Sequence, residues 1–307
     1  MREINRTLLF LTLVATLFSG CLAFHGGPLP GQPLAGPYTT IDDTQIHYTD
    51  TGPSYNGETL VMIHGFGATM ANWMGLVPPL VERGYRVVAL DLRGHGWSGR
   101  PDADYSIEAQ ARIVLGLVDQ LGVDDFTVVG HSWGSAVSLQ VTLLAQERVE
   151  RVVLFNGMFF KNQQPVVFHW ARVPGLGEVI YGVFYPERQD EKMAFAFYDA
   201  ESIIDEPMVE AVESMMKRPG TLAAALASVR AMRFDEMEPH YSDITQPTLL
   251  LWGREDQVTP LRHGERIYQT LGNARLVVLP QCGHLPMIEA PNTSLKELIR
   301  FLDESAS

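Results

Sequence analysis

Cysteine and basic residues are scarce in this 307-residue chain, which has 2 Cys and 23 Lys plus Arg against 36 Asp plus Glu. Two cysteines cannot build a disulfide framework, and two alone do not suggest a structural zinc site. A formal net charge of −13 also lacks the attraction to phosphate backbones on which nucleic-acid binding depends. We therefore expect no nucleic-acid partner, and the sequence indicates no cofactor or metal site.

The apolar content is high enough for a large core, because 46% of the residues are hydrophobic and only 19% are charged. This balance excludes a wholly disordered or fibrous chain. The length fits one large α/β domain or two smaller units.

Residues 1–20 have the order of a secretory signal peptide. Two arginines precede the apolar run 8–18, which is too short to span a bilayer comfortably. The run leads into Phe18-Ser19-Gly20-Cys21, which resembles a bacterial lipobox, although Phe18 stands where that pattern prefers Leu. On this interpretation Cys21 carries acyl chains, and the protein is a membrane-anchored lipoprotein of the bacterial cell envelope, facing outside the cytoplasm. The alternative is ordinary cleavage near Ala23, which gives a secreted or periplasmic soluble protein.

Residues 21–37 are rich in Pro and Gly and show no hydrophobic period. Such a segment is typical of a tether that holds a folded domain away from a membrane. We expect the domain to begin near Tyr38.

From Tyr38 onward, short apolar runs alternate with helical patterns. Continuous apolar strands between helices indicate a mostly parallel sheet with helices on both faces. We place this α/β core at residues 38–157 and 242–307. The strands are expected at residues 38–41, 45–48, 60–63, 87–90, 127–129, 152–155, 248–251 and 276–279, the first two forming a hairpin through Asp42-Asp43, and helices at 106–121, 135–146, 263–271 and 291–302.

Residues 158–241 break the alternation, because the patterns there are helical and interrupted by prolines. An inserted helical unit between two sheet strands is expected to form a cap, or lid. The segment holds seven of the 12 methionines and many aromatic residues. We interpret most of them as the packed core of the cap and some as the lining of an apolar channel.

Ser132 stands at the centre of the motif Gly130-His131-Ser132-Trp133-Gly134, directly after the strand 127–129 and before a helix. This strand–turn–helix setting predicts a sharp turn that exposes the Ser132 hydroxyl at the sheet edge. A serine hydroxyl is a weak nucleophile at neutral pH, so it needs a base, which in turn needs an orienting acid.

The chain offers an acid and a base in the loops after two later strands, and we predict Asp256 and His284 in these roles. Carboxyl ends of parallel strands share one edge, where open α/β sheets bind ligands. Glu255 is a rival to Asp256, whereas the loop after 152–155 begins with Asn156-Gly157 and offers no acid nearby. Among the other histidines, His95 and His131 lie in turns, where structural roles are expected.

Two backbone N–H groups are predicted to stabilise the oxyanion. One belongs to Trp133, the residue after the nucleophile, and the other most simply to Phe66 in His64-Gly65-Phe66-Gly67. Fixed donors at a developing oxyanion stabilise it by ~3–4 kcal/mol each. The alternative for residues 64–67 is an ordinary glycine turn.

Together these segments resemble the α/β-hydrolase fold family, in its serine-nucleophile branch with a helical cap. The resemblance runs from about Tyr38 to the C-terminus and rests on residues 64–67, 91–98, 130–134, Asp256 and Gly283-His284. It implies an acyl-enzyme route in which Ser132 attacks, His284 moves the proton and Asp256 orients His284. It also implies that the cap follows the sixth strand.

Ser132 departs from family members that use an Asp nucleophile, and Gly65-Phe66-Gly67-Ala68 departs from the Gly-Gly-Pro-Gly loop of proline iminopeptidases. The apolar cap favours a carboxylesterase or lipase that takes a small-molecule ester of an apolar acyl group. A carbon–carbon bond hydrolase or lactonase of the same fold is the alternative, and a non-catalytic ligand carrier is a distant one.

Overall fold

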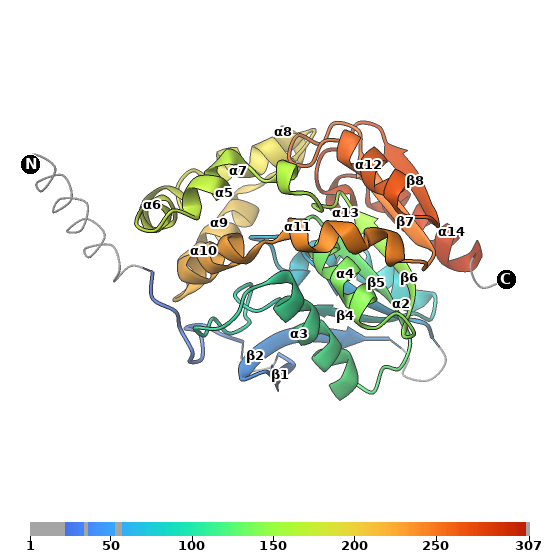
Figure 1. Ribbon diagram of the computed structural model, residues 1–307, viewed down its shortest axis with the longest axis horizontal. Helices are drawn as coiled ribbons and strands as arrows, with labels where there is room; N and C mark the ends of the chain where they lie inside the picture. The colour runs from blue at the N-terminus through green and yellow to red at the C-terminus, as the bar shows by residue number, and fades with distance from the viewer. Residues whose placement is uncertain (1–21, 34–35, 53–56, 305–307) are drawn as a thin grey trace, which may run out of the picture.

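The computed structural model describes residues 22–33, 36–52 and 57–304, and an eight-stranded sheet forms its centre (Figure 1). The strands lie in the order β1-β2-β4-β3-β5-β6-β7-β8. Their ends differ from the predicted ones by three residues or fewer. The bounds are β1 Tyr38–Ile41, β2 Thr44–Thr51, β3 Thr59–Ile63, β4 Arg86–Leu90, β5 Phe126–His131, β6 Val149–Phe155, β7 Thr248–Gly253 and β8 Ala274–Leu279.

The sheet is mostly parallel, which confirms the predicted fold class. β3 to β8 pair in parallel, whereas β2 is antiparallel to both β1 and β4. Ile41 pairs with Thr44, so Asp42 and Asp43 form a two-residue hairpin loop with φ of 48° and 54°. Positive φ at both positions matches the twist of an antiparallel pair, as the predicted hairpin requires.

Helices cover both faces of the sheet because the buried strands have two apolar sides. In β3, Val61 and Ile63 join one core cluster with α3 and α4, while Leu60 and Met62 join a second cluster with α14. The core helices are η1 Met70–Trp73, α2 Val77–Glu82, α3 Ile107–Gln120, α4 Trp133–Leu144, α12 Arg262–Thr270, α13 Pro286–Glu289 and α14 Pro291–Glu304.

The chain between β6 and β7 forms a helical cap above the sheet (Figure 1). Prolines set its helix boundaries: Pro165 precedes α5 and Pro207 lies in the first turn of α9, while Pro174, Pro186 and Pro219 lie in connections. The cap comprises η2 Lys161–Gln163, α5 Val166–Ala171, α6 Leu176–Val179, η3 Ile180–Phe184, α7 Gln189–Ala196, α8 Ala200–Ile203, α9 Glu206–Met216, α10 Thr221–Ala231, α11 Phe234–Met237 and η4 Glu238–Asp243.

Residues 22–33 lie against the domain, which differs from the tether expected to keep the domain at a distance. The backbones of His25 and Arg100 exchange two hydrogen bonds of 2.8 and 3.3 Å, and Leu29 is buried. Phe24 stacks on Tyr105 at a ring distance of 5.9 Å. The segment has no hydrophobic period. Single apolar side chains and hydrogen bonds to the backbone of Arg100 are enough to hold it against the domain.

Among the residues that the structure describes, no helix combines the length and apolar character needed to cross a bilayer. Cys21 and the apolar run 8–18 lie outside those residues. The signal peptide and the lipidation of Cys21 therefore stay predictions.

Candidate functional site

Ser132 occupies a strained turn between β5 and α4, with φ of 52° and ψ of −122°. The flanking glycines explain how the chain enters and leaves this turn. A Cβ on Gly130 would lie 2.3 Å from Ser138 Oγ, and one on Gly134 would lie 2.3 Å from the carbonyl oxygen of His64. No side chain fits at either position. The glycines of the motif are therefore required by the same tight turn that strains the backbone of Ser132.

Asp256 and His284, predicted as acid and base, contact each other in the loops after β7 and β8, and the His284 ring lies 4.7 Å from that of His131, the residue before Ser132. His284 Nδ1 lies 2.9 Å from Asp256 Oδ2. Burial alone would raise the pKa of the Asp256 carboxyl. The facing His284 and the hydrogen bonds from His284, Asn156 and Thr259 outweigh burial, and they hold this pKa well below its ordinary value. Asp256 is therefore a carboxylate that orients the imidazole.

Two neighbours of Asp256 are functional candidates that the sequence analysis missed. The Asn156 amide donates to Asp256 Oδ2 and, at 3.1 Å, to the carbonyl of Gly283. The Thr259 hydroxyl lies 2.6 Å from the same Oδ2. Asn156 is the first residue after β6. Its side chain is an amide, so it cannot be the orienting acid expected at a strand end. Its position at the carboxyl end of a parallel strand is the sequence feature that could have indicated a role in the site.

Glu255, the rival acid, accepts a hydrogen bond from the backbone N–H of Cys282 at 3.0 Å. It therefore supports the loop that carries His284. Cys282 itself is buried, and burial raises the pKa of its thiol, so this group is a poor nucleophile.

His131 joins the serine turn to the histidine loop. Its Nε2 lies 2.9 Å from the carbonyl oxygen of His284, and the two rings are 4.7 Å apart. Burial and the neighbouring His284 lower the pKa of His131 to about 3, so the ring is neutral near pH 7 and donates from Nε2. The structural role expected for His131 thus includes positioning His284 beside Ser132.

The loop after β3 approaches Ser132 as an oxyanion loop must. A Cβ on Gly65 would lie 2.9 Å from Ser132 Cβ, so only glycine allows this approach. Phe66 follows directly, and its ring lies 6.2 Å from that of Trp133. Trp133 is the first residue of α4, where an N–H has no carbonyl partner within its own helix. Phe66 and Trp133 therefore both lie next to the serine turn, and their oxyanion role stays a prediction.

His64 fixes the oxyanion loop by its tautomer. The Leu92 N–H donates to Nε2 at 3.0 Å, so the proton lies on Nδ1, which donates to the Gly65 carbonyl at 2.7 Å. Burial lowers the pKa of His64, which keeps the ring neutral. His95, expected to have a structural role, packs between His64 and Trp133 at ring distances of 5.2 and 5.7 Å.

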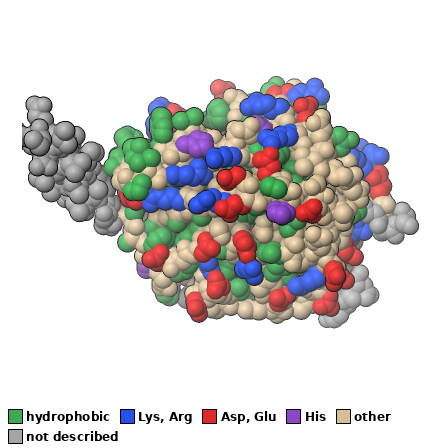
Figure 2. Space-filling model, in the orientation of Figure 1, with side chains coloured by type: hydrophobic (Ala, Val, Ile, Leu, Met, Phe, Trp, Pro, Cys, Tyr) green, Lys and Arg blue, Asp and Glu red, His purple; other side chains and the backbone are tan. Residues whose placement is uncertain are grey.

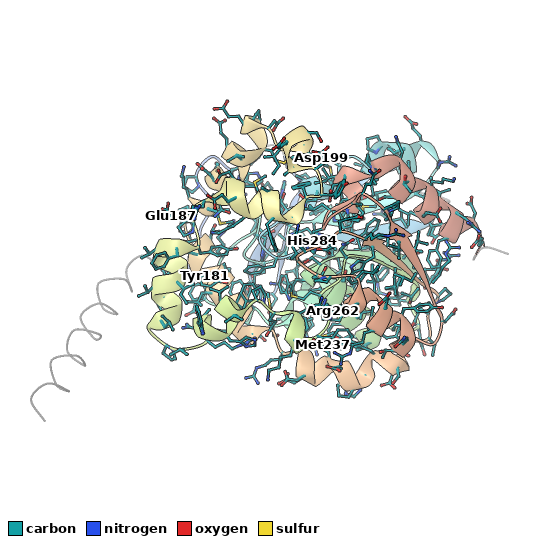
Figure 3. The ribbon with its side chains drawn as sticks, turned by 90° about the horizontal axis from the view of Figure 1, so that it is seen from above. Tyr181, Glu187, Asp199, Met237, Arg262 and His284 are labelled. Carbon is teal, nitrogen blue, oxygen red and sulfur yellow. The ribbon has the colours of Figure 1, made fainter. Side chains whose placement is uncertain are left out.

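The cap closes over the site. Ser132, Asp256 and His284 are only 6%, 4% and 6% exposed. The backbone N–H of His284 donates to the carbonyl of Ala196 at the end of α7, at 2.7 Å. Phe66 packs against Phe168 of the cap, with ring centroids 5.5 Å apart. Seen from above, His284 lies toward the middle of the molecule, with cap residues such as Tyr181 to one side (Figure 3).

Comparison with known proteins shows the family. Residues 58–291 match the model of the alpha/beta hydrolase fold, so the chain belongs to this family and is a hydrolase of that fold. It is 30% identical over 269 residues to a 2-hydroxy-6-oxononadienedioate/2-hydroxy-6-oxononatrienedioate hydrolase of Paraburkholderia xenovorans (strain LB400), covering 85% of this chain and 91% of the relative.

Solved structures show the same fold. The enol-lactonase from Burkholderia xenovorans LB400 has a TM-score of 0.74 at 24% identity, covering 87% of this chain and all of that one, a likeness of fold alone. A membrane phospholipase A described as a bacterial virulence factor has a TM-score of 0.73 at 25% identity, with 100% of both chains covered.

Proposed function

We propose that the protein hydrolyses a bond beside a carbonyl carbon through an acyl-enzyme on Ser132, with His284 as base and Asp256 as its orienting acid. The observation that carries this proposal is the Asp256–His284 contact of 2.9 Å at the edge of the sheet where Ser132 stands in a strained turn. This combination of nucleophile, base and orienting acid is the arrangement that serine acyl transfer needs.

In the proposed reaction, Ser132 Oγ forms a bond to the substrate carbonyl carbon while His284 takes its proton. Negative charge collects on the carbonyl oxygen, where the N–H groups of Phe66 and Trp133 stabilise it. The tetrahedral intermediate then expels its leaving group, which receives the proton from His284. Water, deprotonated by His284, attacks the acyl-enzyme and releases a carboxylic acid and free Ser132.

A carbon–carbon bond or a lactone is the first choice for the bond that is broken, ahead of the open-chain ester expected from the sequence. The name of the Paraburkholderia relative describes an oxo-dienedioate, a compound without an ester, so its hydrolysis breaks a carbon–carbon bond. A carbon leaving group must be stabilised as a carbanion by conjugation, which such a dienoate provides. The structural likeness to an enol-lactonase is one of fold only.

An ester of an apolar acyl group is the second candidate, and the surroundings of Ser132 favour it. The rings gathered at the oxyanion loop belong to uncharged residues, Phe66, Trp133, Phe168 and Tyr185. A dianionic substrate would leave its charges against these apolar faces, which is costly. The likeness to a membrane phospholipase A over the whole of both chains points the same way.

A substrate panel tests the proposal. We would measure kcat/KM for a 2-hydroxy-6-oxo-dienoate, an aliphatic lactone and p-nitrophenyl esters of increasing chain length. Activity on one class that is lost in Ser132→Ala would support the mechanism, and the preferred class would select the substrate. A Ser132→Ala protein as active as the parent would overturn it, and a folded parent inactive on every class would favour the ligand carrier.

We also propose, from the residues before Leu22, that Cys21 is lipidated and that the protein is anchored outside the cytoplasm. The pattern Phe18-Ser19-Gly20-Cys21 supports this proposal. Mass spectrometry of the mature N-terminus tests it, because an unmodified terminus beyond Cys21 would show ordinary cleavage instead.

A further inference from the structure

The cap carries most of the exposed large apolar side chains of the described residues. Eight of the eleven such side chains come from cap residues between 166 and 198. We call the stretch on α5, α6, η3 and their connections the apolar cap face. Its members are Val166, Val167, Trp170, Val173, Leu176 and Phe184, of which Val166, Trp170 and Phe184 are 63%, 57% and 64% exposed. Large apolar patches on a surface mark interaction sites.

A basic hollow lies next to this face. It measures about 540 Å³ and is lined by Lys161, His169, Arg172, Arg230 and Arg233, with Asp235 as its carboxylate. Arg172 follows Trp170 by two residues, and its guanidinium donates to Gln164 Oε1 and to the carbonyl of Met232, both at 3.0 Å. In Figure 2, Lys and Arg side chains gather beside the hydrophobic ones on this side of the molecule. Lys161, Arg230 and Arg233 lie 4.0, 2.9 and 3.5 Å from carboxylates, those of Asp235, Glu178 and Glu236 respectively. With Arg172 the hollow therefore has four cations against three carboxylates, a positive balance in a chain of net charge −13.

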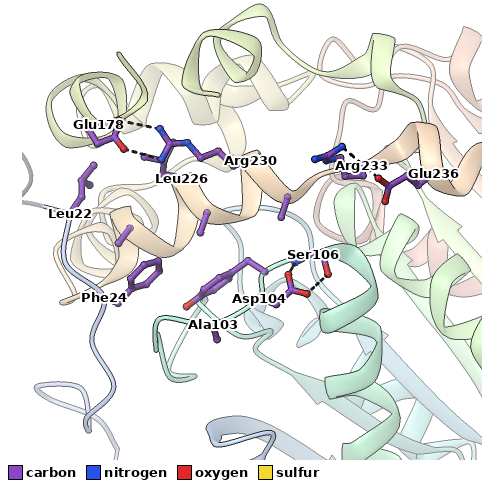
Figure 4. Close-up of a pocket in the computed structure, with 14 residues that line it drawn as sticks. Leu22, Phe24, Ala103, Asp104, Ser106, Glu178, Leu226, Arg230, Arg233 and Glu236 are labelled. Carbon is purple, nitrogen blue, oxygen red and sulfur yellow. Dashed lines mark hydrogen bonds and ion pairs between the residues drawn. The ribbon is translucent and has the colours of Figure 1, made fainter. Parts of the chain in front are cut away.

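The chain enters the domain at the same place. Leu22, the first described residue, lines a cavity with Phe24, Glu178 and Arg230 under the cap (Figure 4). A Cβ on Gly182 in η3 would lie 4.0 Å from Leu22 Cγ. On the proposal that Cys21 is lipidated, the acyl chains are attached to the residue directly before Leu22. They would therefore join the chain beside the apolar cap face.

We propose that the apolar cap face and its basic hollow bind the surface of a bilayer that contains anionic phospholipid. Trp170, Phe184 and the valines of α5 would enter the interfacial region, as aromatic and aliphatic side chains do on interfacial helices. Lys161, Arg172 and Arg233 would meet the lipid phosphates, whose surface potential attracts basic residues near the membrane. The rest of the acidic molecule is repelled by the same surface, so this face alone is turned toward it.

Trp170 provides the test, because it is the exposed tryptophan of the face. Trp73, Trp133 and Trp252 are fully buried, and Trp97 is partly buried under the Arg218 guanidinium. The full-length chain is reconstituted into vesicles with brominated acyl chains, with and without phosphatidylglycerol, and tryptophan quenching is measured. Incorporation is checked by flotation. We expect quenching that rises with phosphatidylglycerol and that is mostly lost in Trp170→Phe.

Two further variants separate docking of the face from anchoring by the N-terminus. Phe184→Glu should reduce the quenching of Trp170, whereas Tyr268→Glu, which changes a side chain 45% exposed on α12, should not. Quenching that is absent, or the same in Trp170→Phe and Phe184→Glu as in the parent, would overturn the proposal. A dimer in solution that Phe184→Glu dissociates, with Trp170 unquenched by lipid, would assign the face to a second copy of the chain. None of these readouts depends on hydrolysis, so the docking proposal and the proposed function can fail separately.

Discussion

The Asn156 side chain donates an N–H to Oδ2 of Asp256, the same oxygen that faces Nδ1 of His284 at 2.9 Å. Asn156 also accepts the backbone N–H of Gly253 at 3.1 Å through its own Oδ1. One amide therefore ties the ends of β6 and β7 to the loop that carries the base. These hydrogen bonds hold the ends of β6 and β7 and the loop after β8 together, and so give the imidazole a rigid support.

Asn156→Ala should destabilise the protein by ~1–3 kcal/mol at neutral pH, because it leaves buried partners without a hydrogen bond. It should also make the pKa of Asp256 less depressed. A depressed carboxyl pKa stabilises the fold above the unfolded-state value, near 4, and this stability is lost as the pH falls through the folded pKa. The difference in free energy of unfolding between parent and variant should therefore become smaller below about pH 4.

Urea unfolding at several pH values measures this gap. Asn273→Ala is the matched control, since the exposed Asn273 amide donates only to the Thr245 carbonyl at 3.3 Å. A variant at Asn156 no less stable than the control would show that the amide is not part of the support.

Ser132→Gly should be more stable than Ser132→Ala by about 1 kcal/mol, although both remove the nucleophile. At φ of 52° and ψ of −122° a Cβ is strained, and glycine removes the strain at the cost of some chain entropy. Thermal unfolding of the two inactive variants under the same conditions gives the difference. Equal stability would mean that the serine turn stores no strain.

Gly134→Ala should destabilise the fold by at least ~1–3 kcal/mol and lower activity, because its Cβ would meet the His64 carbonyl at 2.3 Å. Backbone atoms cannot move aside as a flexible side chain can. Gly272→Ala is the control, since a Cβ there has no atom within 4 Å. Comparing their unfolding midpoints and kcat/KM checks the prediction, and two variants alike in both would contradict the packing argument.

The sheet and the positions of Ser132, Asp256 and His284 could be predicted because their signals are local. Continuous apolar runs mark buried strands, and the residues that follow each run come to one edge of a parallel sheet. The glycines of residues 130–134 indicate the tight turn, because they have no side chains to obstruct it. Asn156 could not be predicted because its contact with Asp256 spans 100 residues of chain. Thr259 lies only three residues after Asp256, but the direction of its hydroxyl depends on the turn of the loop, which leaves no sequence pattern.

The packing of residues 22–33 was also beyond the sequence signal. Pro and Gly there indicate no regular structure, and indeed none of the segment is helical. The segment is held by the burial of the single side chain of Leu29 and by hydrogen bonds to the backbone of Arg100, neither of which leaves a periodic pattern. The substrate class cannot be predicted for a related reason. The rings around Phe66 come from α4, α5, the residue after η3 and the loop after β4, which only the fold brings together.

Stability should fall as the pH is lowered from about 6.5, because buried neutral histidines must remain uncharged in the fold. Burial and the nearby His64 lower the pKa of His95 to about 3. Between these values the unfolded chain binds a proton that the folded protein does not. The stability that depends on a neutral His95 is therefore complete above about pH 6.5 and decreases down to about pH 3.

His95→Asn should reduce the slope of unfolding free energy against pH in this window by up to ~1.4 kcal/mol per pH unit, whatever its effect on stability at pH 7. Urea titrations at half-unit pH steps measure the slope. His240→Gln serves as the control, because the His240 side chain is 61% exposed. A slope unchanged in His95→Asn, or reduced equally in His240→Gln, would show that His95 takes up a proton without unfolding the protein.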